Sequence, residues 1–169
     1  LKLHDIPTTV NKAARVLGAL GASYLTVHAH GGVDMLRAAV EGLDAGAANV
    51  GLPSPAAIAV TVLTSDDTAP PHILAKRVAA AVDGGCSGIV CAASDVREAK
   101  QLAPRLIAVV PGIRLSGSDR HDQARAASPD VAIEAGADLL VIGRTVTGAA
   151  DRALAASMVA GAVAAASAA

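Results

Sequence analysis

The pattern that decides the fold is clearest in residues 136–144, which read GADLLVIGR. A Gly-Ala pair is a common helix end, because glycine adopts the left-handed backbone that a short turn into a strand needs. The apolar run 139–142 has the length of a buried strand, and Gly143 opens the loop that follows. This stretch therefore predicts a helix end, a strand and a loop, in that order.

The same pattern recurs along the chain. Short apolar runs, each followed by a loop and an alanine-rich stretch with helical periodicity, occur at 1–3, 24–27, 58–63, 88–90, 106–109 and 139–142. Residues typical of helix starts stand at Pro7, Ser94-Asp95 and Ser128-Pro129. Six βα units predict an α/β protein with a parallel sheet. No linker rich in proline or serine divides the chain, so we expect one domain over residues 1–169.

Two parallel architectures fit this order, an open doubly wound sheet and a (β/α)8 TIM barrel. Unusual polar residues gather at the predicted carboxyl ends of the strands, where barrels place their chemistry, and this favours the barrel. A complete barrel has eight strands and about 250 residues, or a little over 200 in a lean version. We therefore expect an incomplete barrel, the C-terminal part with about six of eight βα units, whose first strands would precede Leu1.

Composition and charge exclude several classes of protein. Hydrophobic residues make up 53% of the chain and charged residues 17%, which excludes a disordered tail. With 41 alanines and no phenylalanine or tryptophan, the core must be packed from small aliphatic side chains. A net charge of −1 leaves no electrostatic basis for binding nucleic acid.

The two ends of the chain and its two cysteines indicate where in the cell the protein is expected. The uncharged tail after Arg152 carries its larger side chains at helical spacing, at Leu154, Met158, Val159 and Val163. This spacing predicts a final helix packed on the core and no role in a membrane. Cys86 and Cys91 lie in apolar stretches, which predicts small buried side chains in a reducing compartment. The sequence opens without a basic and apolar leader, so we expect a cytoplasmic protein.

Three of the predicted strand ends carry candidate functional residues. Lys2 and Asp5 form a Lys-x-x-Asp pattern, and a carboxylate near an ammonium at a barrel mouth would keep that ammonium charged as a general acid. His28 and His30 could bind a metal, but no third ligand lies nearby in the sequence, which favours a core histidine at position 28. The Thr64 hydroxyl could donate to a ligand or cap a turn.

The last two strand ends suggest a phosphate site. Residues 110–125 form a long loop with Arg114 and several glycines, and such loops in compact barrels are usually lids or binding loops. Gly143 and Arg144 follow the next strand. The loops after the last two strands of a barrel commonly hold phosphate through backbone N–H groups and a bidentate arginine. The two loops together predict a phosphate monoester ligand.

Together these segments resemble the orotidine 5′-phosphate decarboxylase family in its bacterial form, from Leu1 to about Arg152. Residues 2–9, KLHDIPTT, look like the family signature D-x-K-x-x-D-I-P-x-T without its leading aspartate. Further segments recur in order at 26–32, 60–65, 111–123 and 141–144. The resemblance implies decarboxylation of orotidine 5′-phosphate to UMP in pyrimidine biosynthesis, without metal or organic cofactor, in a homodimer with shared active sites.

The resemblance also implies residue roles. Two residues would be catalytic: Lys2, which protonates C6 of the pyrimidine as carbon dioxide leaves, and Asp5, which completes a charged network in the partner subunit's site. The substrate-binding residues would be Thr9 beside Asp5, Thr64 at the pyrimidine, Gln123 between base and phosphate, and Arg114, Gly143 and Arg144 at the phosphate.

Two other functions remain open. The first is a related sugar-phosphate enzyme such as 3-hexulose-6-phosphate synthase, which uses magnesium; it should show extra acidic ligands, and residues 28–32 and 61–65 supply none. The second is a truncated or degenerate barrel that binds nucleotide without turnover. The family's aspartate before Leu1 and its upstream aspartate and lysine are absent from these 169 residues.

Overall fold

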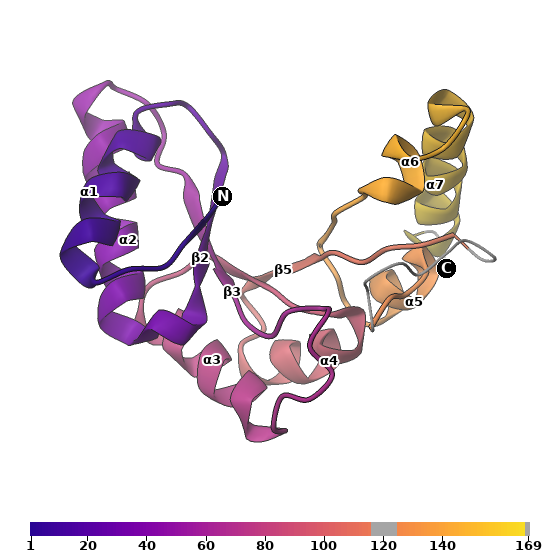
Figure 1. Ribbon diagram of the computed structural model, residues 1–169, viewed down its shortest axis with the longest axis horizontal. Helices are drawn as coiled ribbons and strands as arrows, with labels where there is room; N and C mark the ends of the chain where they lie inside the picture. Colours follow the sequence, from indigo (N-terminus) through magenta and orange to yellow (C-terminus); the bar gives the residue numbers. More distant parts are fainter. Residues whose placement is uncertain (116–124, 168–169) are drawn as a thin grey trace.

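The computed structural model describes residues 1–115 and 125–167 and contains one six-stranded sheet in the order β1-β2-β3-β4-β5-β6 (Figure 1). Each strand pairs in parallel with its neighbour in the sequence. All six predicted strands are present, and the α/β class is confirmed. Their bounds are β1 Lys2–Leu3, β2 Tyr24–His28, β3 Ala56–Val60, β4 Gly88–Val90, β5 Ile107–Val110 and β6 Leu139–Leu140.

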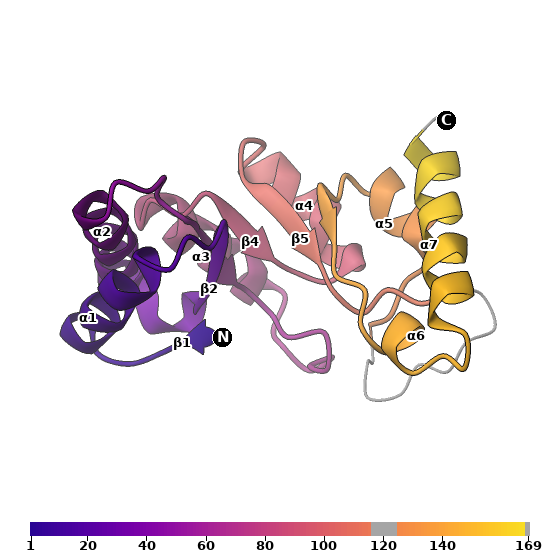
Figure 2. The same cartoon turned by 90° about the horizontal axis from the view of Figure 1, so that it is seen from above.

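The helices follow the sheet in sequence order, from α1 and α2 at one end to α5, α6 and α7 at the other (Figure 2). A short 3-10 turn, η1, covers Ala29–Gly31. The α-helices are α1 Pro7–Gly18, α2 Gly32–Asn49, α3 His72–Asp83, α4 Ala93–Leu102, α5 Pro129–Glu134, α6 Arg144–Thr147 and α7 Arg152–Ser167.

The strand register divides the sheet into one face that the helices cover and one face, called the bare face, that carries no helices. Residues that pair across parallel strands share a face, and successive residues along one strand alternate between faces. One row belongs to the hydrophobic core under the helices and contains Leu3, Val27, Ala59, Ile89 and Ala108. The alternate row contains Lys2, Thr26, Ile58, Gly88 and Ile107. Lys2 therefore lies on the face that the helices leave bare.

The sheet is open. In the described part of the chain, β1 pairs only with β2 and β6 only with β5. On the face without helices, Tyr24 is 50% and Val141 47% exposed, whereas Ile58 and Val60 on the central strand β3 are each 1% exposed. The fold is thus an incomplete (β/α)8 barrel with six of the eight βα units, as predicted.

Two of the boundaries that differ from the sequence prediction are those of β3 and α4. The third strand begins at Ala56, two residues before the predicted start, because Ala56 and Ala57 are held in register by β2. Alanine gives no strand signal of its own, so only pairing reveals this start. Helix α4 begins at Ala93 and therefore includes Ser94-Asp95 in its first turn.

The predicted final helix is present as α7, but its packing was only partly predicted. Its buried residues are Ala155 and Val159, whereas Leu154 is 58% and Met158 55% exposed. The helix therefore packs through one expected side chain, Val159, and one alanine. In residues 1–115 and 125–167, no helix combines the length and the apolar character needed to cross a bilayer.

Helices α1 and α2 pack unusually closely because glycines line their contact. A methyl group built on Gly42 would lie closer than 3.0 Å to the carbonyl oxygen of Asn11, and one on Gly46 equally close to that of Arg15. Gly18 meets the backbone of Leu43 in the same way. The two helix backbones thus lie so close together at these positions that there is no room for a Cβ atom between them.

An ion pair at the amino ends of β5 and β6 connects the last units of the sheet. The Asp138 carboxylate accepts hydrogen bonds from Lys100 Nζ at 2.6 Å and from the Ala108 amide at 2.7 Å. Partial burial by itself raises the pKa of Asp138, but the hydrogen bonds from Lys100 and Ala108 and the charge of Lys100 outweigh it and hold the pKa below its usual value. Helix α4 is thereby joined to the last two strands.

Candidate active site

Lys2, the lysine of the Lys-x-x-Asp pattern, is the first residue of the edge strand β1. It lies on β1, on the bare face of the sheet, and its register partner is Thr26 of β2. The Thr26 hydroxyl donates to the carbonyl of Leu1, which holds the edge strand to the sheet. The Lys2 side chain is exposed because no strand covers that edge of β1 in the described part of the chain.

Asp5 and Thr9 follow Lys2 at the junction of β1 and α1. The Ile6 amide donates to Asp5 Oδ1 at 2.7 Å, and Pro7 occupies the first position of the helix, where its missing N–H costs no hydrogen bond. Thr9 lies in the first turn, and both Asp5 and Thr9 are exposed. No ion pair joins Lys2 to Asp5 within the described residues, so Asp5 does not neutralise Lys2 of its own chain.

Three histidines meet beside Lys2, one more than the sequence indicated. The His4 ring lies 5.6 Å from the ring of His28 and 5.5 Å from that of His30, measured between centroids. They line a cavity of about 260 Å³ together with Arg77 of α3. Register brings His4 there, since β1 pairs with β2. Within residues 1–115 and 125–167, no three His, Cys, Asp or Glu side chains are arranged to hold a metal ion.

His28 of this cluster has a lowered pKa. Partial burial lowers the pKa of His28, and the neighbouring charges of His4, Lys2, Arg77 and His30 lower it further. His28 is half-buried on β2, in partial agreement with the predicted core histidine. It is therefore neutral at pH 7 and adds no positive charge beside Lys2.

Thr64 lies just beyond β3 and is only 9% exposed. Its backbone carbonyl accepts a hydrogen bond from the Arg125 amide at 3.1 Å. A chain segment that returns after the long loop thus meets the strand end that carries Thr64. Gln123, predicted to bridge base and phosphate, lies outside the described residues.

The predicted phosphate residues come from two segments that the fold brings into contact. Arg114 follows β5 and is 8% exposed; its guanidinium lies 3.5 Å from the Thr145 hydroxyl and donates to the Ile113 carbonyl at 2.8 Å. Thr145 also donates to that carbonyl, at 2.7 Å. Thr145 is adjacent to Arg144, the first residue of α6, and Gly143 precedes it with open space around its Cα. No sequence pattern pointed to Thr145, because its contact with Arg114 depends on the fold.

The structure does not bring the two halves of the predicted site together. Lys2 is in β1, Thr9 in α1 and Asp5 between them, at one edge of the sheet, whereas Gly143 and Arg144 follow β6 at the other edge. Figure 1 shows α1 and α6 on opposite sides of the molecule. In a closed barrel two further strands would join these edges, and all carboxyl strand ends would face one mouth. Thr64 and Arg114 lie between the edges, after β3 and β5.

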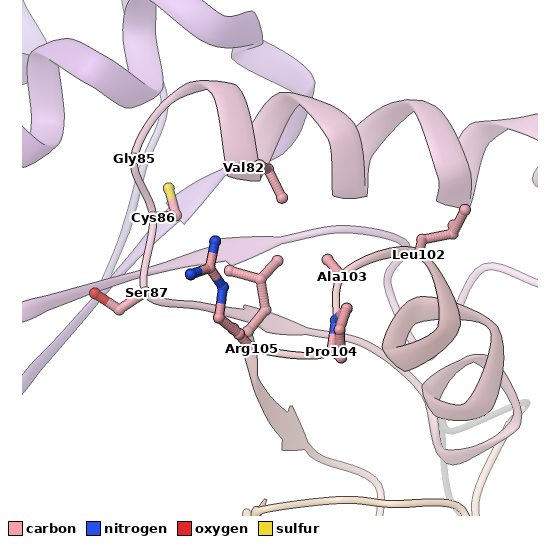
Figure 3. A pocket seen from close by; sticks show the side chains of 9 residues that line it. Val82, Gly85, Cys86, Ser87, Leu102, Ala103, Pro104 and Arg105 are labelled. Atoms are coloured by element: carbon pink, nitrogen blue, oxygen red, sulfur yellow. The ribbon is translucent and has the colours of Figure 1, made fainter.

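A larger cavity of about 410 Å³ lies at the opposite ends of the strands (Figure 3). Its lining includes Val82, Cys86, Leu102 and Arg105, and it adjoins the amino ends of β4 and β5. Barrel enzymes place their chemistry at the carboxyl ends, so this cavity is separate from the candidate site.

The two cysteines are free and buried, as predicted. Burial raises the pKa of Cys86 to about 11, and burial with the nearby Asp95 charge raises that of Cys91 to about 12. A raised pKa keeps a thiol protonated at neutral pH, and the protonated form is a poor nucleophile.

A parallel sheet whose strands lie side by side in sequence order, with polar and charged side chains at their carboxyl ends, is typical of the (β/α)8-barrel class. A model of the "Orotidine 5'-phosphate decarboxylase / HUMPS family" matches residues 1–159. The chain therefore belongs to the orotidine 5′-phosphate decarboxylase / HUMPS family.

Individual relatives agree with this assignment. The chain is 45% identical to the orotidine 5′-phosphate decarboxylase of Anaeromyxobacter dehalogenans, over 95% of this chain and 72% of that protein. It is 43% identical to the enzyme of the same name from Thermobifida fusca, over 95% of this chain and 70% of the relative. The crystal structure of orotidine 5′-phosphate decarboxylase from Lactobacillus acidophilus is similar with a TM-score of 0.76 and 31% identity, covering 96% of this chain and 73% of that one.

Proposed function

We propose that the chain forms most of an enzyme that decarboxylates orotidine 5′-phosphate to UMP. The observation that carries this proposal is the placement of Lys2 on the bare sheet face of a chain that belongs to this family. In the proposed step the bond from C6 to the carboxylate breaks and carbon dioxide leaves. The electron pair that remains on C6 takes a proton from the Lys2 ammonium. No cofactor is needed to balance this reaction.

The chemistry explains why a lysine is suited to this position. Negative charge develops on C6 only as the carboxylate departs, so an ammonium next to that carbon stabilises the transition state more than the ground state. A fixed ammonium also supplies the proton without a separate diffusion step. Lys2 is proposed to perform both roles.

The phosphate end would supply binding energy away from the reacting carbon. Arg114 is buried and in contact with Thr145, and this joins the segment after β5 to the segment that carries Gly143 and Arg144. The contact supports one shared phosphate site built from both segments. Thr64 would hydrogen-bond the pyrimidine between the two ends, and Gln123 would bridge base and phosphate.

Arg144→Ala tests the phosphate assignment. In a polypeptide that supplies the two βα units needed to close the barrel, we expect UMP to bind at least about 10-fold more weakly, because a charge-assisted contact is lost. Uridine, which has no phosphate, should bind almost unchanged. Isothermal titration with both ligands measures the difference, and Arg152→Ala, an exposed arginine on α7, is the matched control. An equal loss for UMP and uridine would remove Arg144 from the phosphate site.

Asp5 is proposed to act in the active site of a second copy of the chain. Its exposure and the absence of an ion pair with Lys2 of its own chain, within the described residues, are consistent with this role. In a homodimer of this kind each active site would combine Lys2 of one subunit with Asp5 and Thr9 of the other.

Mixing two inactive variants tests the shared site. Lys2→Ala and Asp5→Ala proteins, after subunit exchange, should recover up to about a quarter of the normal activity, because half of the dimers would be mixed and hold one intact site in two. Each variant mixed with itself is the control. Continued inactivity after exchange has been verified by mass spectrometry would contradict the shared site.

The open sheet favours one second candidate function. β1 and β6 have no further strand partner in the described part of the chain, so these residues alone form an open, truncated barrel, which could bind nucleotide without turnover. This function predicts that UMP binds while orotidine 5′-phosphate is not consumed, even when the barrel is closed. An absorbance assay for loss of orotidine 5′-phosphate, run beside the UMP titration, separates the two functions.

A further inference from the structure

An ion pair between Arg125 and Asp95 lies beside the candidate site and has no role in the reaction described above. Both Asp95 carboxylate oxygens accept from Arg125 Nη1, at 2.8 and 2.7 Å. The two side chains are only 20% and 15% exposed. Asp95 lies in the first turn of α4, and its own amide donates to the Ala92 carbonyl, which fixes its backbone. The aspartate is therefore a rigid, partly desolvated anchor for the arginine.

The remainder of Arg125 holds the backbone beyond β3. Arg125 Nη2 donates to the Leu63 carbonyl at 3.0 Å and to the Val62 carbonyl at 3.4 Å. The Arg125 backbone amide donates to the Thr64 carbonyl at 3.1 Å. One residue thus binds three consecutive carbonyls in a segment that has already left the sheet, where no neighbouring strand determines its path.

Only arginine fits this set of acceptors. Its planar guanidinium carries five N–H donors in a fixed fork, whereas a lysine ammonium has three donors at one point. The guanidinium of Arg125 donates to four oxygen atoms. Two belong to the Asp95 carboxylate on α4, and two are the backbone carbonyls of Val62 and Leu63 beyond β3. A lysine could neutralise Asp95 but could not also reach both carbonyls with comparable geometry.

We propose that Arg125 is a positioning residue: anchored by Asp95, it sets the backbone at Thr64 and thereby the place of the Thr64 hydroxyl against the pyrimidine. This inference rests on the proposed function, in which Thr64 contacts the base. Arg125 itself touches neither base nor phosphate in this scheme. It acts through the backbone that it holds.

A double-mutant cycle tests this route. In the barrel-closing polypeptide, Arg125→Lys and Asp95→Asn should each lower kcat/KM for orotidine 5′-phosphate by about 10- to 100-fold, because small misplacements of a binding group cost this much. Thr64→Val removes the hydroxyl at nearly constant volume. Combining Arg125→Lys with Thr64→Val should cost no more than the larger single change, because both variants lose the same contact.

The control is a second Asp–Arg pair that is open to solvent. Asp34 and Arg37 on α2 lie 3.4 Å apart with side chains 86% and 52% exposed, and Asp34→Asn should change neither kcat/KM nor the unfolding midpoint measurably. A role of Arg125 in stability alone predicts additive losses of kcat/KM in the cycle, and additive losses would overturn the proposal. If Arg125→Lys fails to fold, Asp95→Asn takes its place in the cycle with Thr64→Val, because either substitution disrupts the ion pair.

Measuring UMP affinity in the same cycle separates this proposal from the proposed function. If the unmodified polypeptide binds UMP but does not consume orotidine 5′-phosphate, the decarboxylase function fails while the cycle can still be completed with UMP. Non-additive losses of UMP affinity between Arg125→Lys and Thr64→Val would then support positioning. Additive losses, or a Thr64→Val variant with unchanged affinity, would overturn it.

Discussion

Lys2→Ala is expected to abolish decarboxylation in a polypeptide that closes the barrel, with kcat lowered by at least about 10³-fold. The substitution removes both the proposed proton donor and the positive charge beside C6. UMP should still bind with nearly normal affinity, because its phosphate and base contacts lie on other strands. Loss of orotidine 5′-phosphate absorbance measures kcat, and isothermal titration measures UMP binding.

Lys12→Ala is the matched control for this experiment. Lys12 is an exposed lysine on α1, only ten residues along the chain, and belongs to none of the proposed site groups. It should keep full activity. Substantial turnover by the Lys2→Ala protein would show that another group donates the proton to C6. Loss of UMP binding together with activity would instead indicate that Lys2 is needed to form the site.

Gly46→Ala is expected to give the largest loss of stability among single methyl additions. The new Cβ would overlap the Arg15 carbonyl oxygen, which belongs to the backbone of α1 and cannot rotate away. Overpacking of this kind costs about 1–3 kcal/mol. Alanine is favoured over glycine inside a helix by about 1 kcal/mol, so any net destabilisation arises from the contact between the helices. The midpoint of urea unfolding measures the change.

Gly161→Ala on α7 is the control, because nothing lies within 4 Å of the added methyl group. Here the helix propensity acts alone, and the midpoint should rise or stay constant. If the Gly46→Ala and Gly161→Ala proteins had the same midpoint of urea unfolding, helices α1 and α2 would move apart at little cost in free energy. The close packing at Gly42 and Gly46 would then not contribute to the stability of the first βα units.

Much of the fold could be predicted from local patterns. Short apolar runs and Gly-Ala turns predicted all six strands, and Gly21 and Gly136 do adopt the positive φ that such turns need. The third strand begins two residues and ends three residues earlier than predicted; its start was missed because Ala56 and Ala57 carry no β preference and are ordered by pairing with β2. The burial of Leu154 and Met158 was wrong because helical spacing shows which residues share a face but not what covers it.

Some features of the candidate site could also be predicted from the sequence, and others could not. Lys2, Asp5 and the glycines and arginines near the end of the chain could be selected because their residue types and order are specific. The contacts of His4 with His28, of Thr145 with Arg114 and of Arg125 with Asp95 could not be predicted, since the partners lie 24 to 31 positions apart. No local periodicity relates residues at such separations.

The sequence by itself determined the alternation of strands and helices, the family and the residue types available for chemistry, because these depend on neighbouring residues and on ordered motifs. Only the tertiary structure decided that Lys2 occupies the bare face of the sheet, that Arg125 holds the segment ending in Thr64, and that β1 and β6 leave the sheet open. The physical reason is that strand register and side-chain contacts form between distant segments, and their geometry is set by packing of the whole chain.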